Sequence, residues 1–160
     1  MKARSQSVYA GLAISLYAAW NARDLPLAWM HSPYDRMGWL AFLLWLQPLG
    51  CFWMCRQVLG AELFKQSGVA LFALGLAVSF TGVVVDLNAV KYLGLALSLG
   101  GFLPPGPALW AWLGCAAGWM PVIGWTLSLH STLMVNLIRV VSGLVALFLT
   151  PLFLRYESKS

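Results

Sequence analysis

Apolar residues fill most of this chain and are interrupted by short polar connections. The apolar runs cover residues 8–22, 37–55, 67–85, 89–103, 108–129 and 133–154. A bilayer core about 30 Å thick is crossed by about 20 residues of α-helix. The pattern therefore predicts six membrane segments. The fourth is short and is stopped by the sequence PPGP, so we expect a tilted span or a re-entrant element there.

Composition supports the same interpretation. Apolar residues make up 61% of the chain and charged residues 9%, whereas soluble domains carry about 25% charged residues. We expect an all-α fold, a polytopic transmembrane helix bundle that forms a single integral membrane domain over residues 1–160. The expected surrounding is the lipid bilayer.

The basic residues predict the orientation in the membrane. They are scattered singly, which is not typical of a nucleic-acid-binding surface. Six segments place both termini on one side of the membrane, and cytoplasmic connections are enriched in Lys and Arg. That side would carry Lys2, Arg4, Arg56, Lys65, Arg155 and Lys159, and the other side Arg23, Arg36 and Lys91. We expect a plasma membrane protein, in a bacterium the inner membrane, with both termini cytoplasmic.

Small residues recur at helical spacing in the middle of the chain. Such residues let helix backbones approach closely. This spacing indicates packing between helices of the same chain or, alternatively, a homo-oligomer contact. The residues fall into three groups: Gly75, Ser79 and Gly82; Gly94, Ser98 and Gly101; and Gly114 with Gly118.

The last apolar segment contains the one charge that lies well inside any of them, Arg139. Residues three and four apart share a helix face, so Thr132, Asn136, Arg139 and Ser142 form a polar stripe that begins near His130. Arg139 lies roughly 12 Å into the segment at 1.5 Å per residue. We expect it to face protein or a polar cavity, because a charge facing lipid is costly. These five residues are the candidate binding site, and structural pairing of Arg139 is the alternative.

The same periodicity places the apolar residues of this segment on other faces. Leu133, Val135, Leu137, Val140 and Val141 should lie largely away from the polar stripe.

Other reactive residues show no pattern of a catalytic or metal site. Cys51 and Cys55 lie one helical turn apart without further ligands, and Cys115 is far from His130 along a continuous helix. The chain contains no phosphate-binding glycine loop and no paired carboxylates. We therefore expect no metal, no cofactor and no catalytic residue. Asp86 is expected in a turn.

Part of the sequence is similar to a known family. Residues 25–49, read LPLAWMHSPYDRMGWLAFLLWLQPL, resemble the first luminal loop and following span of the exosortase/archaeosortase family. The hairpin near Asp86, the run LGLALSLGG and the proline-bearing fifth segment follow in the same order. In that family a later helix carries a catalytic cysteine within A-C-S-G-L. This chain reads VVSGL there, with Val141 in the cysteine position.

The resemblance implies a protein that lacks the family's cysteine transpeptidase or protease chemistry. It implies a non-catalytic, exosortase-like protein that binds a transmembrane partner or a sorting signal. Two alternatives come from the residues themselves. One is a small transporter or channel-like subunit with Arg139 and Asn136 on a polar path. The other is a pigment or electron-transfer accessory subunit that uses His31 or His130.

Overall fold

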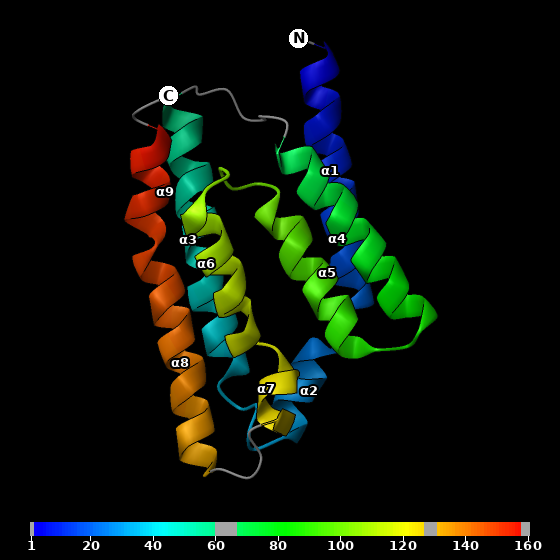
Figure 1. Cartoon of the computed structure of the whole chain (residues 1–160), viewed down its shortest axis with the longest axis vertical. Helices are drawn as coiled ribbons and strands as arrows, with labels where there is room; N and C mark the ends of the chain where they lie inside the picture. The colour runs from blue at the N-terminus through cyan, green and yellow to red at the C-terminus, as the bar shows by residue number, and fades with distance from the viewer. Residues whose placement is uncertain (1, 60–66, 127–130, 158–160) are drawn as a thin grey trace.

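The chain folds into an elongated bundle of helices (Figure 1). The structure is a computed structural model that describes residues 2–59, 67–126 and 131–157, and these residues form helices and no strand. The elements are α1 (Lys2–Asn21), α2 (Leu25–His31), α3 (Gly38–Leu59), α4 (Ser67–Val84), α5 (Asn88–Gly100), α6 (Pro107–Cys115), the 3-10 helix η1 (Ala116–Gly118), α7 (Pro121–Thr126), α8 (Thr132–Phe148) and α9 (Thr150–Glu157). The predicted all-α class is confirmed for these residues.

Two of the predicted segments are divided in the structure, and the connection after the first segment contains a helix. Residues Leu25–His31 in that connection form α2, with Pro26 in its first turn, where proline is tolerated. The segment 108–129 is not one helix. It changes to 3-10 geometry at Ala116 and restarts at Pro121, since proline has no N–H to continue a preceding helix. The segment 133–154 is divided at Leu149 into α8 and α9.

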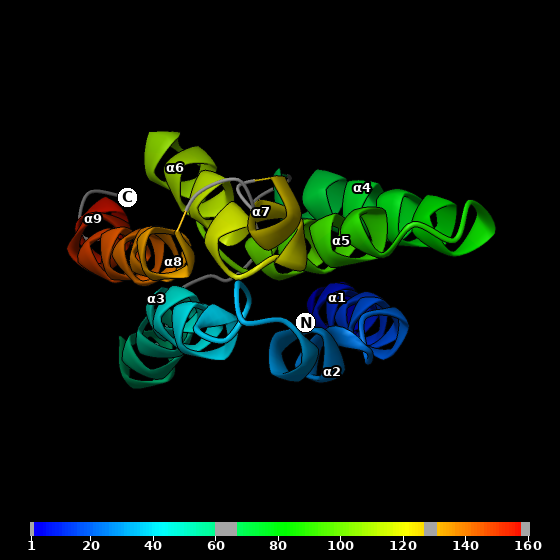
Figure 2. The same ribbon diagram turned by 90° about the horizontal axis from the view of Figure 1, so that it is seen from below.

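The helices form two groups that lie side by side. One group contains α1, α4 and α5, and the other contains α3, α6, α8 and α9 (Figures 1 and 2). The chain alternates between them, because α3 separates α1 from α4 in sequence. The short helices α2 and α7 lie together at one end of the bundle (Figure 1). Neighbours in space are therefore often distant in sequence.

The α4–α5 contact is built from the small residues that the sequence singled out. A Cβ atom added to Gly94 would lie 2.6 Å from the backbone nitrogen of Ser79, and one added to Gly75 would lie 2.7 Å from that of Ser98. Ser79 and Ser98 are fully buried. These residues therefore bring the α4 and α5 backbones together within one chain, which confirms the prediction of internal helix packing for these two groups.

The second group of helices packs around aromatic side chains. Trp45 and Trp112 stack with ring centroids 3.8 Å apart, and Phe42 contacts both Trp45 and Trp119. The indole nitrogen of Trp29 donates to the carbonyl of Trp119 at 2.8 Å. This aromatic cluster joins α2, α3 and α6 to the connection before α7.

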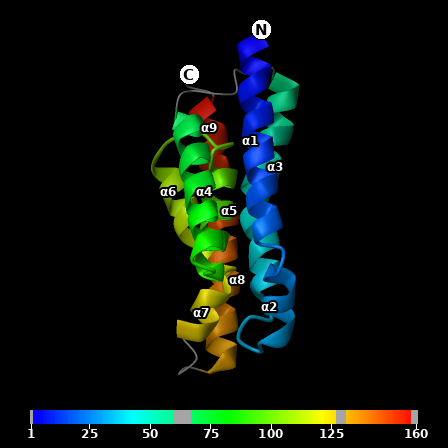
Figure 3. The ribbon, with the colours of Figure 1, turned by 90° about the vertical axis from the view of Figure 1, so that its right-hand side faces the viewer.

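The two ends of the bundle differ. The start of α1 and the end of α9 lie at the same end, opposite α2 and α7 (Figure 3).

Among the described residues, the stretch Thr132–Leu154 is long and apolar enough to cross a membrane. The stretches Gly38–Met54 and Gly68–Val84 are apolar but shorter.

Candidate functional site

Arg139 lies in the protein interior and connects three segments. Its side chain is 0% exposed. Nε donates to the carbonyl of Tyr34 at 2.9 Å, and Nη1 donates to the carbonyls of Gly118 at 2.8 Å and Met120 at 3.1 Å. Nη2 donates to Oδ1 of Asp35. The prediction that Arg139 faces protein is confirmed.

Asp35 is the counter-charge of Arg139. It lies in the loop between α2 and α3, and its side chain is buried. Burial raises the pKa of the Asp35 carboxyl above its ordinary value, against the opposing effects of the Arg139 charge and of hydrogen bonds from Ser32 and Arg139. Asp35 therefore takes up a proton at a higher pH than an exposed aspartate does.

Asn136 binds the same loop one helical turn before Arg139. Its Oδ1 accepts from the backbone nitrogen of Met37 at 3.3 Å, and its Nδ2 donates to the carbonyl of Pro33 at 3.1 Å. Together with Arg139, this side chain holds both ends of the loop against α8. The loop is thus placed by side chains about 100 positions further along the chain.

Ser142 and Gly118 form the next contact along this face. The Ser142 hydroxyl lies 3.1 Å from the carbonyl of Arg139 and 3.3 Å from that of Cys115. A Cβ atom added to Gly118 would overlap the Ser142 hydroxyl, at 1.5 Å. Glycine at position 118 therefore allows η1 to approach α8 and lets its carbonyl reach Arg139.

The remaining candidate residues contribute differently. Thr132 is exposed at the start of α8, so it does not share the enclosed site of Arg139. His130 lies outside the described residues. Val135 was expected away from the stripe, but it is fully buried. Positions 135, 139 and 143 are four apart and share the face that packs on α3.

The arrangement has the chemistry of a structural cross-link. A guanidinium group carries five N–H donors, and four hydrogen bonds to protein groups engage those of Arg139. Three acceptors are backbone carbonyls, which are strong acceptors in a dry interior. The fourth is a carboxylate that neutralises the charge. Little donor capacity is left for a ligand at Arg139.

Sequence reasoning missed Asp35 as a member of this site. One signal was present, because an embedded arginine needs a counter-charge and the chain has only five acidic residues. The carbonyl partners carry no such signal, since every residue offers a backbone carbonyl.

The cysteines and Val141 lie outside this site. Cys51 and Cys115 are free and half-buried, and the described residues contain no group of three His, Cys, Asp or Glu side chains able to hold a metal ion. Val141, which occupies the position of the family's cysteine in the resemblance, is 48% exposed on the outer side of α8.

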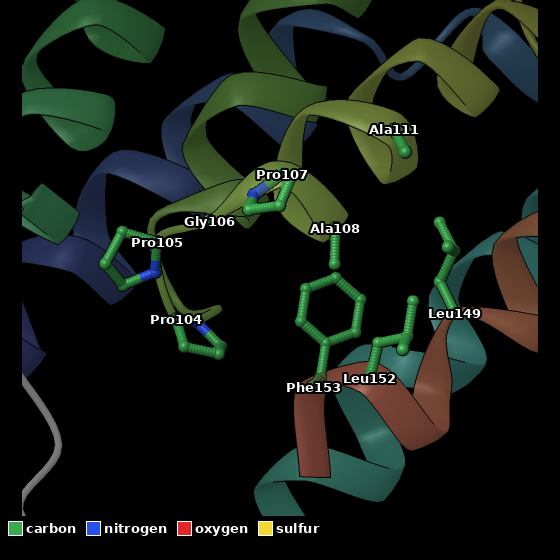
Figure 4. Close-up of a pocket in the computed structure, with 9 residues that line it drawn as sticks. All are labelled: Pro104, Pro105, Gly106, Pro107, Ala108, Ala111, Leu149, Leu152 and Phe153. Carbon is green, nitrogen blue, oxygen red and sulfur yellow. The ribbon is translucent and has the colours of Figure 1, made fainter. Parts of the chain in front are cut away.

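An apolar groove lies at the C-terminal end of α8. It is lined only by apolar residues and glycine, has a volume of about 410 Å³, and separates the start of α6 from the α8–α9 junction (Figure 4). Phe153, Leu152 and Leu149 line it from α9 and the junction, and Pro104–Pro107 and Ala108 line it from the opposite side.

Comparisons with known proteins supply no relative for this arrangement. No family model matches the chain, and no curated protein and no solved structure matches it either.

Proposed function

We propose that this chain is a multi-pass membrane protein that binds a transmembrane segment of a partner and does not catalyse a reaction itself. The observation that carries the proposal is the distribution of polarity on α8, which is the reverse of that on a helix of a soluble protein. Arg139 is enclosed, while apolar side chains occupy the outer surface of the same helix. The exposed large apolar residues of α8 are Leu133, Met134, Leu137, Val141, Leu144, Val145 and Phe148.

The other long helices show the same distribution. Leu16 on α1, Leu43 on α3 and Phe80 on α4 are all exposed. Monomeric soluble proteins rarely expose contiguous apolar surface beyond a few hundred Å². In a bilayer these faces contact acyl chains, and the buried serines, Asp35 and Arg139 avoid lipid. Membrane embedding accounts for both features together.

The absence of catalysis is supported by the chemistry of the enclosed site. Arg139 and Asn136 bind the loop before α3, which favours a structural role over a polar path. Val141 has no thiol and faces outward. We propose that any kinship with exosortases survives in partner binding, with the apolar groove between α6 and the α8–α9 junction as the contact site.

Orientation gives a first test. We propose that the chain resides in the plasma membrane with both termini cytoplasmic, since both ends of the described chain lie at the same end of the bundle (Figure 1) and more Lys and Arg residues are expected on that side. Reporter fusions after Ser160 and within the loop at Tyr34 should report opposite sides of the membrane. A cytoplasmic signal from both fusions would contradict this topology.

Site-specific photo-crosslinking tests partner binding. A photo-reactive amino acid at Leu152, inside the groove, should form an adduct with one protein that has a transmembrane segment. The same probe at Phe80, exposed on α4, should not form that adduct. Identical adducts from both positions, or lipid adducts alone from Leu152, would contradict the proposed contact site.

A further inference from the structure

A second cleft lies at the end of the bundle where α2, α5 and α7 meet. Its volume is about 680 Å³, within the roughly 300–1,000 Å³ that is usual for small-molecule sites. Leu27, Ala28, Ala89, Pro121 and Val122 make its lining largely apolar. Five polar side chains also reach it, namely Asp24, His31, Asp35, Asn88 and Tyr92.

The polar groups of this cleft differ in whether an opposite charge or a hydrogen bond within the protein satisfies them. Asp35 is paired with Arg139. Nδ1 of His31 lies 2.7 Å from the carbonyl of Leu27, so in the neutral ring Nδ1 donates and Nε2 is an acceptor. Asp24 accepts a hydrogen bond at Oδ2 from the Tyr92 hydroxyl, at 2.9 Å.

Of the two carboxylates in this cleft, Asp24 has no cationic partner among the described residues. Its Oδ1 is enclosed and has no hydrogen-bond partner in the described part of the chain. The two nearby cations are engaged elsewhere, because Lys91 pairs with Asp86 and Arg23 lies over the ring of Trp20. A carboxylate oxygen left without a donor in an enclosed place is costly.

We propose that this cleft binds a protonated amine, with Asp24 as the counter-charge and the apolar lining in contact with the rest of the ligand. An ammonium group supplies both the positive charge and the N–H donors that Asp24 lacks. Asp24 lines the cleft, and its side chain is only half-buried as a whole, so an ammonium group in the cleft can reach its carboxylate. A metal ion fits less well, since the described residues offer no group of three ligands.

The amine has two chemical sources, a lipid headgroup such as ethanolamine or a free small amine. Native mass spectrometry of the purified full chain in detergent separates them. Phosphatidylethanolamine should bind at least about tenfold more tightly than its N-acetylated form, in which a neutral amide replaces the ammonium, as expected for one charge-assisted hydrogen bond. Free ethanolamine should displace phosphatidylethanolamine if the cleft recognises the amine alone. It should fail to displace this lipid if the rest of the lipid is also required.

Variants connect this preference to the cleft. Asp24→Asn keeps the size of the side chain and an acceptor for Tyr92 but removes the charge, so the preference for the ammonium form should disappear. Glu157→Gln removes an equal charge at the end of α9, at the opposite end of the bundle from α2 (Figure 3), and should keep the preference. Val122→Trp narrows the cleft without a change of charge and should weaken binding of the lipid at least about tenfold. Equal binding of the two lipids, or an unchanged preference in Asp24→Asn that elutes and melts like the parent, would overturn the proposal.

Discussion

Trp45 and Trp112 each donate an indole N–H to the backbone carbonyl of the other, at 2.7 and 2.8 Å. Their rings stack at the same time. Both side chains are fully buried. This reciprocal pair joins α3 to α6 and satisfies two donors and two acceptors in an apolar interior.

Replacement of either tryptophan should therefore destabilise the fold. Trp45→Phe and Trp112→Phe each remove one donor and leave a buried carbonyl with one partner fewer, which should cost about 1–2 kcal/mol in addition to the lost ring contact. Trp119→Phe is the matched control, because Trp119 is equally buried but its indole nitrogen has no partner in the described structure. Denaturation in detergent measures all three variants. Equal losses in the three would contradict a contribution from the reciprocal hydrogen bonds.

The α4–α5 contact gives a second prediction. Gly94→Ala places a Cβ atom 2.6 Å from the backbone of Ser79, so α5 must shift, at a cost of about 1–3 kcal/mol. Gly114→Ala in α6 is the control, since nothing lies within 4 Å of its added Cβ. Alanine there should raise stability by about 0.5–1 kcal/mol, because it favours the helix. Gly94→Ala with parental stability would show that α4 and α5 tolerate a wider separation.

Helical periodicity in the sequence predicts part of the fold and of the site, but it does not predict the helix break or the neighbours of each helix. The positions of Gly75 and Gly94 and the inward orientation of Arg139 follow from helical periodicity, because one face of a helix repeats every three to four residues. The break after Cys115 was not located, although Pro121 marked the restart. The assignment of neighbours was also out of reach, since α3 packs against α8 across about 100 residues, and chain order alone does not determine such contacts.

Acidification should affect the α4–α5 turn in a defined direction. Lys91 donates to Asp86 and Asn88, at 2.9 Å each, and its hydrogen bond and charge lower the pKa of Asp86 below the ordinary 3.8. The folded state therefore binds this proton less tightly than the unfolded state does. The contribution of the pair is present above the ordinary pKa and is lost as the pH falls through the lowered pKa.

A comparison with Asp86→Asn measures this contribution. The difference in melting temperature between the parent and the variant should be small, because Asp86 is exposed. It should be constant near neutral pH and vanish in strong acid. A difference that grows on acidification would assign the effect to another group.

The buried pair of Arg139 and Asp35 gives the most demanding prediction. Arg139→Leu removes four hydrogen bonds and leaves the Asp35 carboxylate enclosed without its counter-charge, so we expect a loss of about 3–5 kcal/mol in the free energy of unfolding. Arg139→Lys keeps the charge but lacks the planar fork that reaches two other segments, and should restore only part of that loss. Asp35→Leu alone should also be strongly destabilising, because it leaves the guanidinium charge unpaired.

The double variant Asp35→Leu, Arg139→Leu should cost less than the sum of the two single changes, since it leaves no buried charge. Ser142→Ala, on the same helix face, breaks no ion pair and should cost about 1 kcal/mol. Losses that simply add in the double variant, or parental stability in Arg139→Leu, would show that the two residues are not coupled and that Arg139 does not join the three segments.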